Sequence, residues 1–281
     1  MKLFLFLFII TASINAFCQS YLIMENGMII TTDKNGFVYD LGHYAYPHKV
    51  NMRGGHYFVE EGKILATVDE NGLLFRKYED IPQKILGRGT NYFLSENGEL
   101  FTINQRGQLR TFNSTVFKNA ENFGGNYFTV SKFDETQTNK IIDLMVVNSS
   151  GDVLKVEIPE LTTQNIVSFG GSYFMTNKGI VFTVSEDGRV LEQKNHRVGL
   201  IQKKGGNFFV DSSGYFYTVS EQGELLVPEL PYSMKTSTIL RLGSHYFIDQ
   251  SGKFFVITRE GRVLERTLQD HDFKTAYIIS L

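Results

Sequence analysis

The stretch GGNYF at residues 124–128 decides the fold, because close copies of it recur along the chain as GGHYF, GTNYF, GGSYF, GGNFF and GSHYF. The aromatic residue at its fourth letter falls at seven places: Tyr21, Tyr57, Tyr92, Tyr127, Tyr173, Phe208 and Tyr246. The intervals between these aromatics are 36, 35, 35, 46, 35 and 38 residues. Spacing of this length and regularity predicts seven copies of one supersecondary unit.

Glycines frame each unit at fixed offsets from the aromatic. One stands three residues before it, at Gly54, Gly89, Gly124, Gly170, Gly205 and Gly243. Another follows fifteen residues after it, at Gly36, Gly72, Gly107, Gly188, Gly223 and Gly261, whereas the fourth unit reaches Gly151 nine residues late. Short runs rich in Phe, Tyr, Val, Ile and Thr lie between turn signals, which is typical of strands joined by hairpins.

Each second glycine closes a turn whose chemistry repeats. A residue with a short polar side chain stands three positions earlier, at Asp33, Asp69, Asn104, Asn148, Ser185, Ser220 and Thr258. Such side chains bond the backbone two residues on, and glycine accepts a positive φ without steric cost. An aliphatic residue two positions later opens a further strand, at Val38, Leu74, Leu109, Val153, Val190, Leu225 and Val263.

A fourth apolar segment precedes the next aromatic by seven residues, at Val50, Ile85, Ala120, Ile166, Ile201 and Ile239. Four short antiparallel strands per unit predict an all-β, seven-bladed β-propeller. Ile278 in the final segment TAYIISL occupies the place of Ile85 in a complete unit. We therefore expect the C-terminal strand to pair with the N-terminal blade and close the ring, so that residues 19–281 form one domain.

The first twenty residues, MKLFLFLFIITASINAFCQS, have the layout of a secretory signal peptide. One lysine precedes a short apolar run, and small residues follow it. Residues 1–18 are the predicted signal peptide, which implies a periplasmic or secreted protein. Lipid attachment at Cys18, the only cysteine, is a competing hypothesis that the bulky Phe17 fits poorly. No second apolar run of spanning length follows, so no transmembrane segment is predicted.

Composition narrows the function classes. The 281 residues are 42% hydrophobic and 21% charged, with a formal net charge of −2. This balance argues against a nucleic-acid partner. The blade pattern GG-x-YF, NG-x-LFT, G-x-L resembles the pyrroloquinoline-quinone-type and regulator-of-chromosome-condensation-type propeller repeats. The chain contains no tryptophan, whereas the quinone-type repeat usually ends in one, and no metal or cofactor residue of those proteins maps onto it.

A ring of polar residues is the first candidate site. Immediately before the repeated aromatics stand Ser20, His56, Asn91, Asn126, Ser172, Asn207 and His245. These seven residues, called the polar ring below, could form a channel mouth that binds a small polar ligand or a sugar. The alternative is that each side chain bonds the backbone of its own glycine turn or of the adjoining blade.

The second candidate site is an insertion in the fourth unit. The nine extra residues lie within SKFDETQTNKIID, between Tyr127 and Gly151, and predict an elongated hairpin that projects from blade four. Loops carried on a rigid scaffold commonly take part in recognition. The candidate binding residues are Lys132, Phe133, Asp134, Glu135 and Lys140.

No catalytic motif, metal-ligand spacing or cofactor signature is evident, so the expected catalytic, metal and cofactor sets are empty. The principal hypothesis is an exported, non-enzymatic binding or scaffold propeller with a protein partner. A carbohydrate-binding propeller is a second hypothesis, and a hydrolase or lyase with its site at the channel mouth is a third. The hydrolase or lyase requires titratable side chains from several blades to converge at that mouth.

Overall fold

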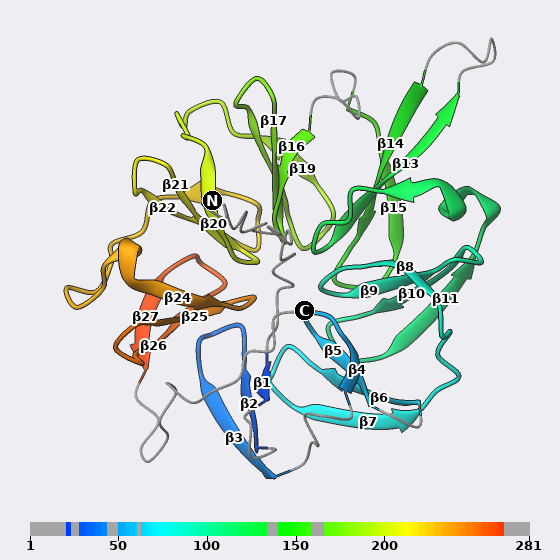
Figure 1. The fold of residues 1–281 in the computed structure, drawn as a ribbon, viewed down its shortest axis with the longest axis horizontal. Helices are drawn as coiled ribbons and strands as arrows, with labels where there is room; N and C mark the ends of the chain where they lie inside the picture. Colours follow the sequence, from blue (N-terminus) through cyan, green and yellow to red (C-terminus); the bar gives the residue numbers. More distant parts are fainter. Residues whose placement is uncertain are drawn as a thin grey trace, which may run out of the picture.

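A computed structural model describes residues 21–23, 28–43, 50–60, 63–133, 140–158 and 166–266. Seven antiparallel sheets stand side by side around a central axis, forming the predicted seven-bladed β-propeller (Figure 1). Three predicted features lie outside the described residues: the signal peptide 1–18, Ser20, and the C-terminal strand around Ile278.

The blades follow one another in chain order, and six of them contain four strands within the described residues. Blade 1 has three: β1 (Tyr21–Ile23), β2 (Met28–Thr32) and β3 (Val38–His43). Blade 2 comprises β4 (Val50–Arg53), β5 (Tyr57–Glu60), β6 (Ile64–Val68) and β7 (Leu74–Tyr78). Blade 3 comprises β8 (Ile85–Arg88), β9 (Tyr92–Ser95), β10 (Glu99–Ile103) and β11 (Leu109–Asn113). Blade 4 comprises β12 (Ala120–Glu121), β13 (Tyr127–Phe133), β14 (Lys140–Val147) and β15 (Val153–Val156).

The remaining blades repeat this order. Blade 5 comprises β16 (Ile166–Phe169), β17 (Tyr173–Thr176), β18 (Val181–Val184) and β19 (Val190–Glu192). Blade 6 comprises β20 (Ile201–Lys204), β21 (Phe208–Asp211), β22 (Phe216–Val219) and β23 (Leu225–Leu226). Blade 7 comprises β24 (Ile239–Leu242), β25 (Tyr246–Asp249), β26 (Phe254–Ile257) and β27 (Val263–Arg266). Among the described residues, two short 3-10 helices, η2 (Thr115–Asn119) and η4 (Thr236–Thr238), precede β12 and β24.

The sequence landmarks coincide with strand starts. Every repeated aromatic is the first residue of a strand, and so is every aliphatic residue placed two positions after the turn glycine. The predicted turn geometry is confirmed in blade 1, where Asp33 Oδ1 accepts hydrogen bonds from the backbone N–H groups of Asn35 (2.9 Å) and Phe37 (2.8 Å). Gly36 follows at φ +83°, a backbone conformation that L side chains rarely adopt.

The repeated tyrosines join each blade to the next. Their rings are fully buried, and the Tyr21 hydroxyl donates a 2.8 Å hydrogen bond to the carbonyl of Tyr57 in the next blade. The same bond recurs from Tyr57, Tyr92, Tyr127, Tyr173 and Tyr246. Phe208 occupies the seventh place and has no hydroxyl. The six tyrosines therefore fill the core between two sheets and each also donates to a buried backbone carbonyl, whereas Phe208 only fills the core.

Blade 7 closes the circle against blade 1. The Tyr246 hydroxyl donates to the Tyr21 carbonyl at 3.1 Å, and Arg266 Nε donates to the Gly36 carbonyl at 2.8 Å. Leu22 and Ile30 of blade 1 share one buried apolar cluster with Val256 of blade 7. The first and last described blades thus pack face to face like any other neighbouring pair.

We expect Tyr127→Phe to lower the free energy of unfolding by about 1 kcal/mol, because it removes a buried hydrogen bond while keeping the ring. That bond joins the Tyr127 hydroxyl to the Tyr173 carbonyl at 2.6 Å. Phe208→Tyr is the complementary variant, since it supplies the hydroxyl that the other six blades have, and it should raise stability. Urea unfolding followed by fluorescence measures both. A Tyr127→Phe protein as stable as the parent would show that this hydrogen bond between blades does not stabilise the fold.

Candidate functional site

Hairpin turns from all seven blades surround a central channel with a volume of about 140 Å³. The turn between the last two strands of every blade lines it, and in blades 2 to 7 the residue before the second strand lines it as well. These positions lie close together, because the backbone N–H of Val68, at the end of β6, donates to the carbonyl of His56, just before β5 (2.8 Å). Both sets of residues therefore belong to the same stretch of channel.

A circle of seven backbone hydrogen bonds runs around this channel. In each turn, the residue after the short polar one donates its N–H to the carbonyl of its equivalent in the next blade. The bonds are Lys34 to Glu70 (3.3 Å), Glu70 to Gln105 (2.9 Å), Gln105 to Ser149 (2.8 Å), Ser149 to Glu186 (2.7 Å), Glu186 to Glu221 (2.9 Å), Glu221 to Arg259 (2.9 Å) and Arg259 to Lys34 (2.8 Å). The circle closes on itself and fixes the same backbone geometry in every blade.

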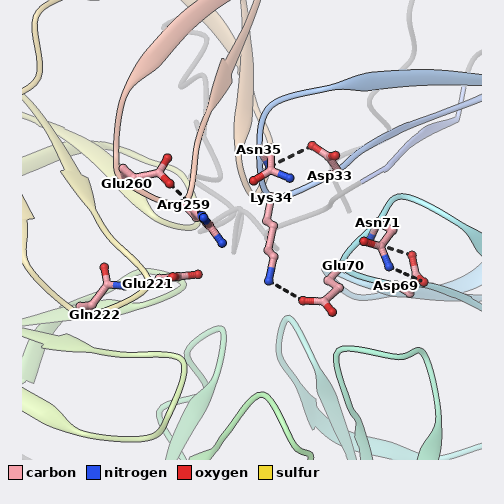
Figure 2. A network of polar contacts seen from close by, with 10 residues as sticks. All are labelled: Asp33, Lys34, Asn35, Asp69, Glu70, Asn71, Glu221, Gln222, Arg259 and Glu260. Carbon is pink, nitrogen blue, oxygen red and sulfur yellow. Dashed lines mark hydrogen bonds and ion pairs between the residues drawn. The ribbon is translucent and has the colours of Figure 1, made fainter.

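The seven residues of this circle, called the turn ring below, differ from blade to blade in their side chains. Five of them are charged, and they carry both signs. Figure 2 shows the side chains of Lys34, Glu70 and Glu221 extending from their turns toward the central opening, with Arg259 beside them. All seven line the channel. The turn ring is therefore a set of varied side chains held at one level by an invariant backbone.

Some charges of the turn ring are paired and others are not. Lys34 Nζ lies 2.5 Å from a Glu70 carboxylate oxygen, and Arg259 Nε lies 2.7 Å from Glu260. The carboxylate of Glu221 accepts a 2.9 Å hydrogen bond from the Gln222 amide. Within the described residues, neither Glu186 nor Glu221 forms an ion pair within 4.0 Å. Lys34 and Arg259 nevertheless interact electrostatically with both carboxylates at longer range.

The environment of Glu186 favours its protonated form. Its side chain is open to the channel but enclosed by the surrounding turns, and this loss of bulk water raises the pKa of Glu186 to about 7. Repulsion from Glu221 is the second cause of the raised pKa, and Lys34 and Arg259 oppose it. A carboxyl group of this kind exchanges its proton near neutral pH.

The structure places six members of the polar ring around the channel, next to the turn ring. Three of them donate to the backbone of the next blade: Asn91 Nδ2 to the Val147 carbonyl (3.2 Å), Asn126 Nδ2 to Ser185 (3.5 Å) and Ser172 Oγ to Gly206 (3.4 Å). The oxygens of the asparagine amides differ from these nitrogens in their hydrogen bonding. In the part of the chain that the structure describes, the Oδ1 atoms of Asn91, Asn126 and Asn207 are buried and accept no hydrogen bond. The amides of Asn91 and Asn126 therefore bond the neighbouring blade through their nitrogens, while the buried oxygens of all three asparagines accept no hydrogen bond among the described residues.

Two histidines of the polar ring stand together. The imidazole centroids of His56 and His245 lie 6.0 Å apart, on blades 2 and 7. Burial lowers the pKa of His56 to about 4. Burial, together with repulsion from His56, lowers the pKa of His245 to about 3. Both rings are neutral at physiological pH and add no positive charge to the channel.

The inserted hairpin extends β13 and β14, which pair from Tyr127↔Val146 to Phe133↔Lys140. At its base, Asp143 lies 2.9 Å from Lys132 Nζ and 3.2 Å from Lys155 Nζ. Asp134 and Glu135 lie outside the described residues. The candidate residues of the hairpin are therefore not brought together with the channel residues by any described contact, and Lys132 takes part in an ion pair within its own blade.

Sequence reasoning missed the turn ring. It identified the residue before each of these positions as a turn former and passed over the next one. The sequence could have indicated the turn ring as a repeat position at which the charge changes from blade to blade while the neighbouring positions hardly vary. The sequence alone could not show that the backbone turns all seven of these residues toward the axis.

The strands and their pairing define a seven-bladed β-propeller, and residues from every blade line its central channel. No protein-family model matches the chain, and no curated protein matches it either. Among solved structures, the selenomethionine-substituted virginiamycin B lyase from Staphylococcus aureus is similar, with a TM-score of 0.37 and 13% sequence identity, over 92% of this chain and 97% of that chain. The propeller assignment itself rests on the strands and their pairing.

Two further observations describe what the site contains. Within the described ranges, no group of three or more His, Cys, Asp or Glu side chains is placed to hold a metal ion. In the same ranges, no helix combines the length and apolar character that crossing a membrane requires.

Proposed function

We propose that this chain is an exported, non-enzymatic binding protein that holds a protein partner at the turn-ring end of the propeller. The observation that supports this most directly is the variation of the turn ring. Positions that build the scaffold repeat one residue type, as the glycines and buried aromatics do. The backbone of the turn ring makes the same hydrogen bond in all seven blades, so the fold does not require these side chains to differ.

Exposed apolar side chains near this end favour a protein partner. Phe37 and Leu73, which follow the turns of blades 1 and 2, are 60% and 55% exposed. Tyr39 and Phe75 continue along β3 and β7 and are also exposed. Aromatic side chains are enriched in protein–protein interfaces. The repeated aromatics, in contrast, are fully buried and unavailable for stacking on sugars, which weakens the carbohydrate hypothesis.

A second candidate function is an acid–base enzyme, either a hydrolase or a lyase, with its site in the channel. The observation that favours it is the convergence of titratable side chains from different blades, including the Lys34–Glu70 pair at 2.5 Å and Glu186, whose pKa of about 7 suits proton transfer. An enzyme would release an altered product, whereas a binding protein returns its partner intact. Mass spectrometry of the bound molecule before and after incubation separates the two.

A steric block tests the proposed binding end without assuming any ligand chemistry. Immobilised mature protein is used to capture a partner from an envelope extract; the partner is identified, purified and its Kd measured. Ser149→Trp places a bulky side chain in the turn ring and should weaken that binding about tenfold or more. Ser213→Trp is the matched control, because its turn joins β21 to β22 at the opposite end of the strands. Equal Kd values for the two variants would refute the proposed location.

A further inference from the structure

Charge in the channel is unbalanced. The turn ring has three carboxylates, Glu70, Glu186 and Glu221, but only two cations, Lys34 and Arg259. Each cation already lies against a carboxylate, Lys34 against Glu70 and Arg259 against Glu260. Glu186 and Glu221 remain, on adjacent turns joined by the 2.9 Å bond from the Glu186 N–H to the Glu221 carbonyl. Lys34 and Arg259 act on these two carboxylates at longer range, but no ion pair within 4.0 Å neutralises either carboxylate among the described residues, so this side of the channel attracts a cation.

Buried acceptors nearby independently indicate a ligand with several hydrogen-bond donors. Asn207 belongs to the same blade as Glu221 and lines the same channel, and its side chain is only 8% exposed. Its Oδ1 accepts no hydrogen bond within the described residues, and the same holds for Asn91, which is equally buried. A buried amide oxygen without a donor costs free energy, which a donor supplied by a ligand recovers.

The size and the other lining groups restrict the ligand further. A channel of about 140 Å³ accommodates roughly one benzene-sized group rather than a larger molecule. His56 and His245 are neutral, since burial lowers the pKa of each well below neutral pH, so they do not repel a cation. The absence of a three-ligand acidic or histidine group in the described residues argues for an organic cation over a metal ion.

We propose that Glu186 and Glu221 bind one ammonium or guanidinium group in the channel, with the orphaned Asn207 oxygen accepting one of its protons. This inference deepens the proposed function and rests on it: the cation is the end of a lysine or arginine side chain, or the N-terminal amine, of the partner. A free small amine presents the same chemistry. The carboxylates supply charge attraction and hydrogen-bond acceptors, and the amide oxygen supplies a further acceptor at the channel wall.

Binding of such a group should depend on pH through Glu186. Burial is the largest cause of the raised pKa of Glu186; among the charged groups, Glu221 and Glu70 raise it further and Lys34 and Arg259 lower it, which gives a value of about 7. An alkylammonium group keeps its proton throughout this range. The affinity should therefore decrease about tenfold as the pH falls from 8 to 6, because Glu186 gains its proton. Glu186→Gln should remove this dependence.

Calorimetric titration of the mature protein with n-butylammonium chloride at pH 8 tests the site, and n-butanol serves as the neutral probe of the same shape. We expect saturable one-to-one binding of butylammonium and none of butanol. Glu186→Gln and Glu221→Gln should each weaken binding about tenfold. Glu229→Gln, which makes the same change at an exposed position outside the channel, should leave the Kd within about twofold.

Three results would overturn the inference: no butylammonium binding, equal binding by the Gln variants, or displacement of the probe by calcium chloride. Competition between butylammonium and the purified partner would assign the cation to the partner, and binding without competition would assign it to a free amine. The two proposals fail separately. If Ser149→Trp blocks the partner and the Gln variants do not, the cation site is wrong and the binding end stands. If butylammonium binds but no protein does, the cation site stands and the proposed binding of a protein partner is wrong.

Discussion

Gly125→Ala is expected to lower the free energy of unfolding by about 3 kcal/mol or more. A Cβ atom at position 125 would lie 2.5 Å from Gly171 Cα and 2.6 Å from Gly171 O, both in the backbone of the adjoining blade. The Gly125 N–H also donates to the Gly171 carbonyl at 2.8 Å, so the two segments cannot separate without losing that bond. Thr90 Oγ1, at 2.5 Å, belongs to a side chain that could rotate away, but the two Gly171 atoms are backbone and could not.

The matched control is Gly179→Ala. A Cβ atom there would meet nothing within 4 Å, but the backbone has a φ of +77°. This variant should lose only about 1 kcal/mol, the usual conformational cost of a side chain at positive φ. Urea unfolding of both proteins gives the comparison. Similar losses in the two variants would mean that the close approach of blades 4 and 5 does not limit side-chain size at Gly125.

The histidine pair should make the propeller less stable in acid. The pKa values of His56 and His245 in the folded protein are about 4 and about 3, against an ordinary value of 6.5. The unfolded chain therefore binds more protons, and stability that is complete above pH 6.5 is lost as the pH falls toward 4. Allowing for partial access of water, the two residues together should contribute about 3 kcal/mol to this loss.

Replacement by the residue that other blades use isolates the effect. Asn occupies the equivalent position in blades 3, 4 and 6, so His56→Asn/His245→Asn is compatible with the fold. The stability difference between parent and double variant is measured by urea unfolding at several values between pH 7.5 and pH 4. Glu186, with its raised pKa, acts in the opposite direction between its ordinary value of 4.5 and about 7, and it cancels in this difference. His196→Asn is the control. A difference that stays constant with pH would contradict the prediction.

Much of the fold could be predicted because the chain repeats its constraints. Tyr92 and Leu109 start strands in blade 3 as their spacing indicates, and Gly107 has the positive φ that its turn requires. Local turn chemistry and burial act in the same way in every blade, so seven examples reinforce one reading. The cross-blade bonds of the tyrosine hydroxyls could not be predicted, since they depend on how far neighbouring sheets are rotated around the axis.

The site was less predictable because its residues follow no repeat. The repeat identified Asn91 and Asn207 but left open whether they bind a ligand or bond the neighbouring blade. In the structure, the Asn91 nitrogen bonds the Val147 carbonyl, and the Oδ1 atoms of both residues accept no hydrogen bond among the described residues. Glu186 and Glu221 lie in turns that read as ordinary surface hairpins. Their importance arises from proximity around the ring, between residues 35 positions apart in sequence. Whether the inserted hairpin takes part in binding stays a prediction.

The closed circle of backbone bonds from Lys34 to Arg259 has a consequence for how the protein could change over time. Because these backbone bonds hold the turns in place, the seven side chains that face the channel can be exchanged one by one without changing its diameter. The ligand selectivity of the channel can then change while the fold stays the same. A new recognition property then requires substitution of a few channel-lining residues rather than a new fold.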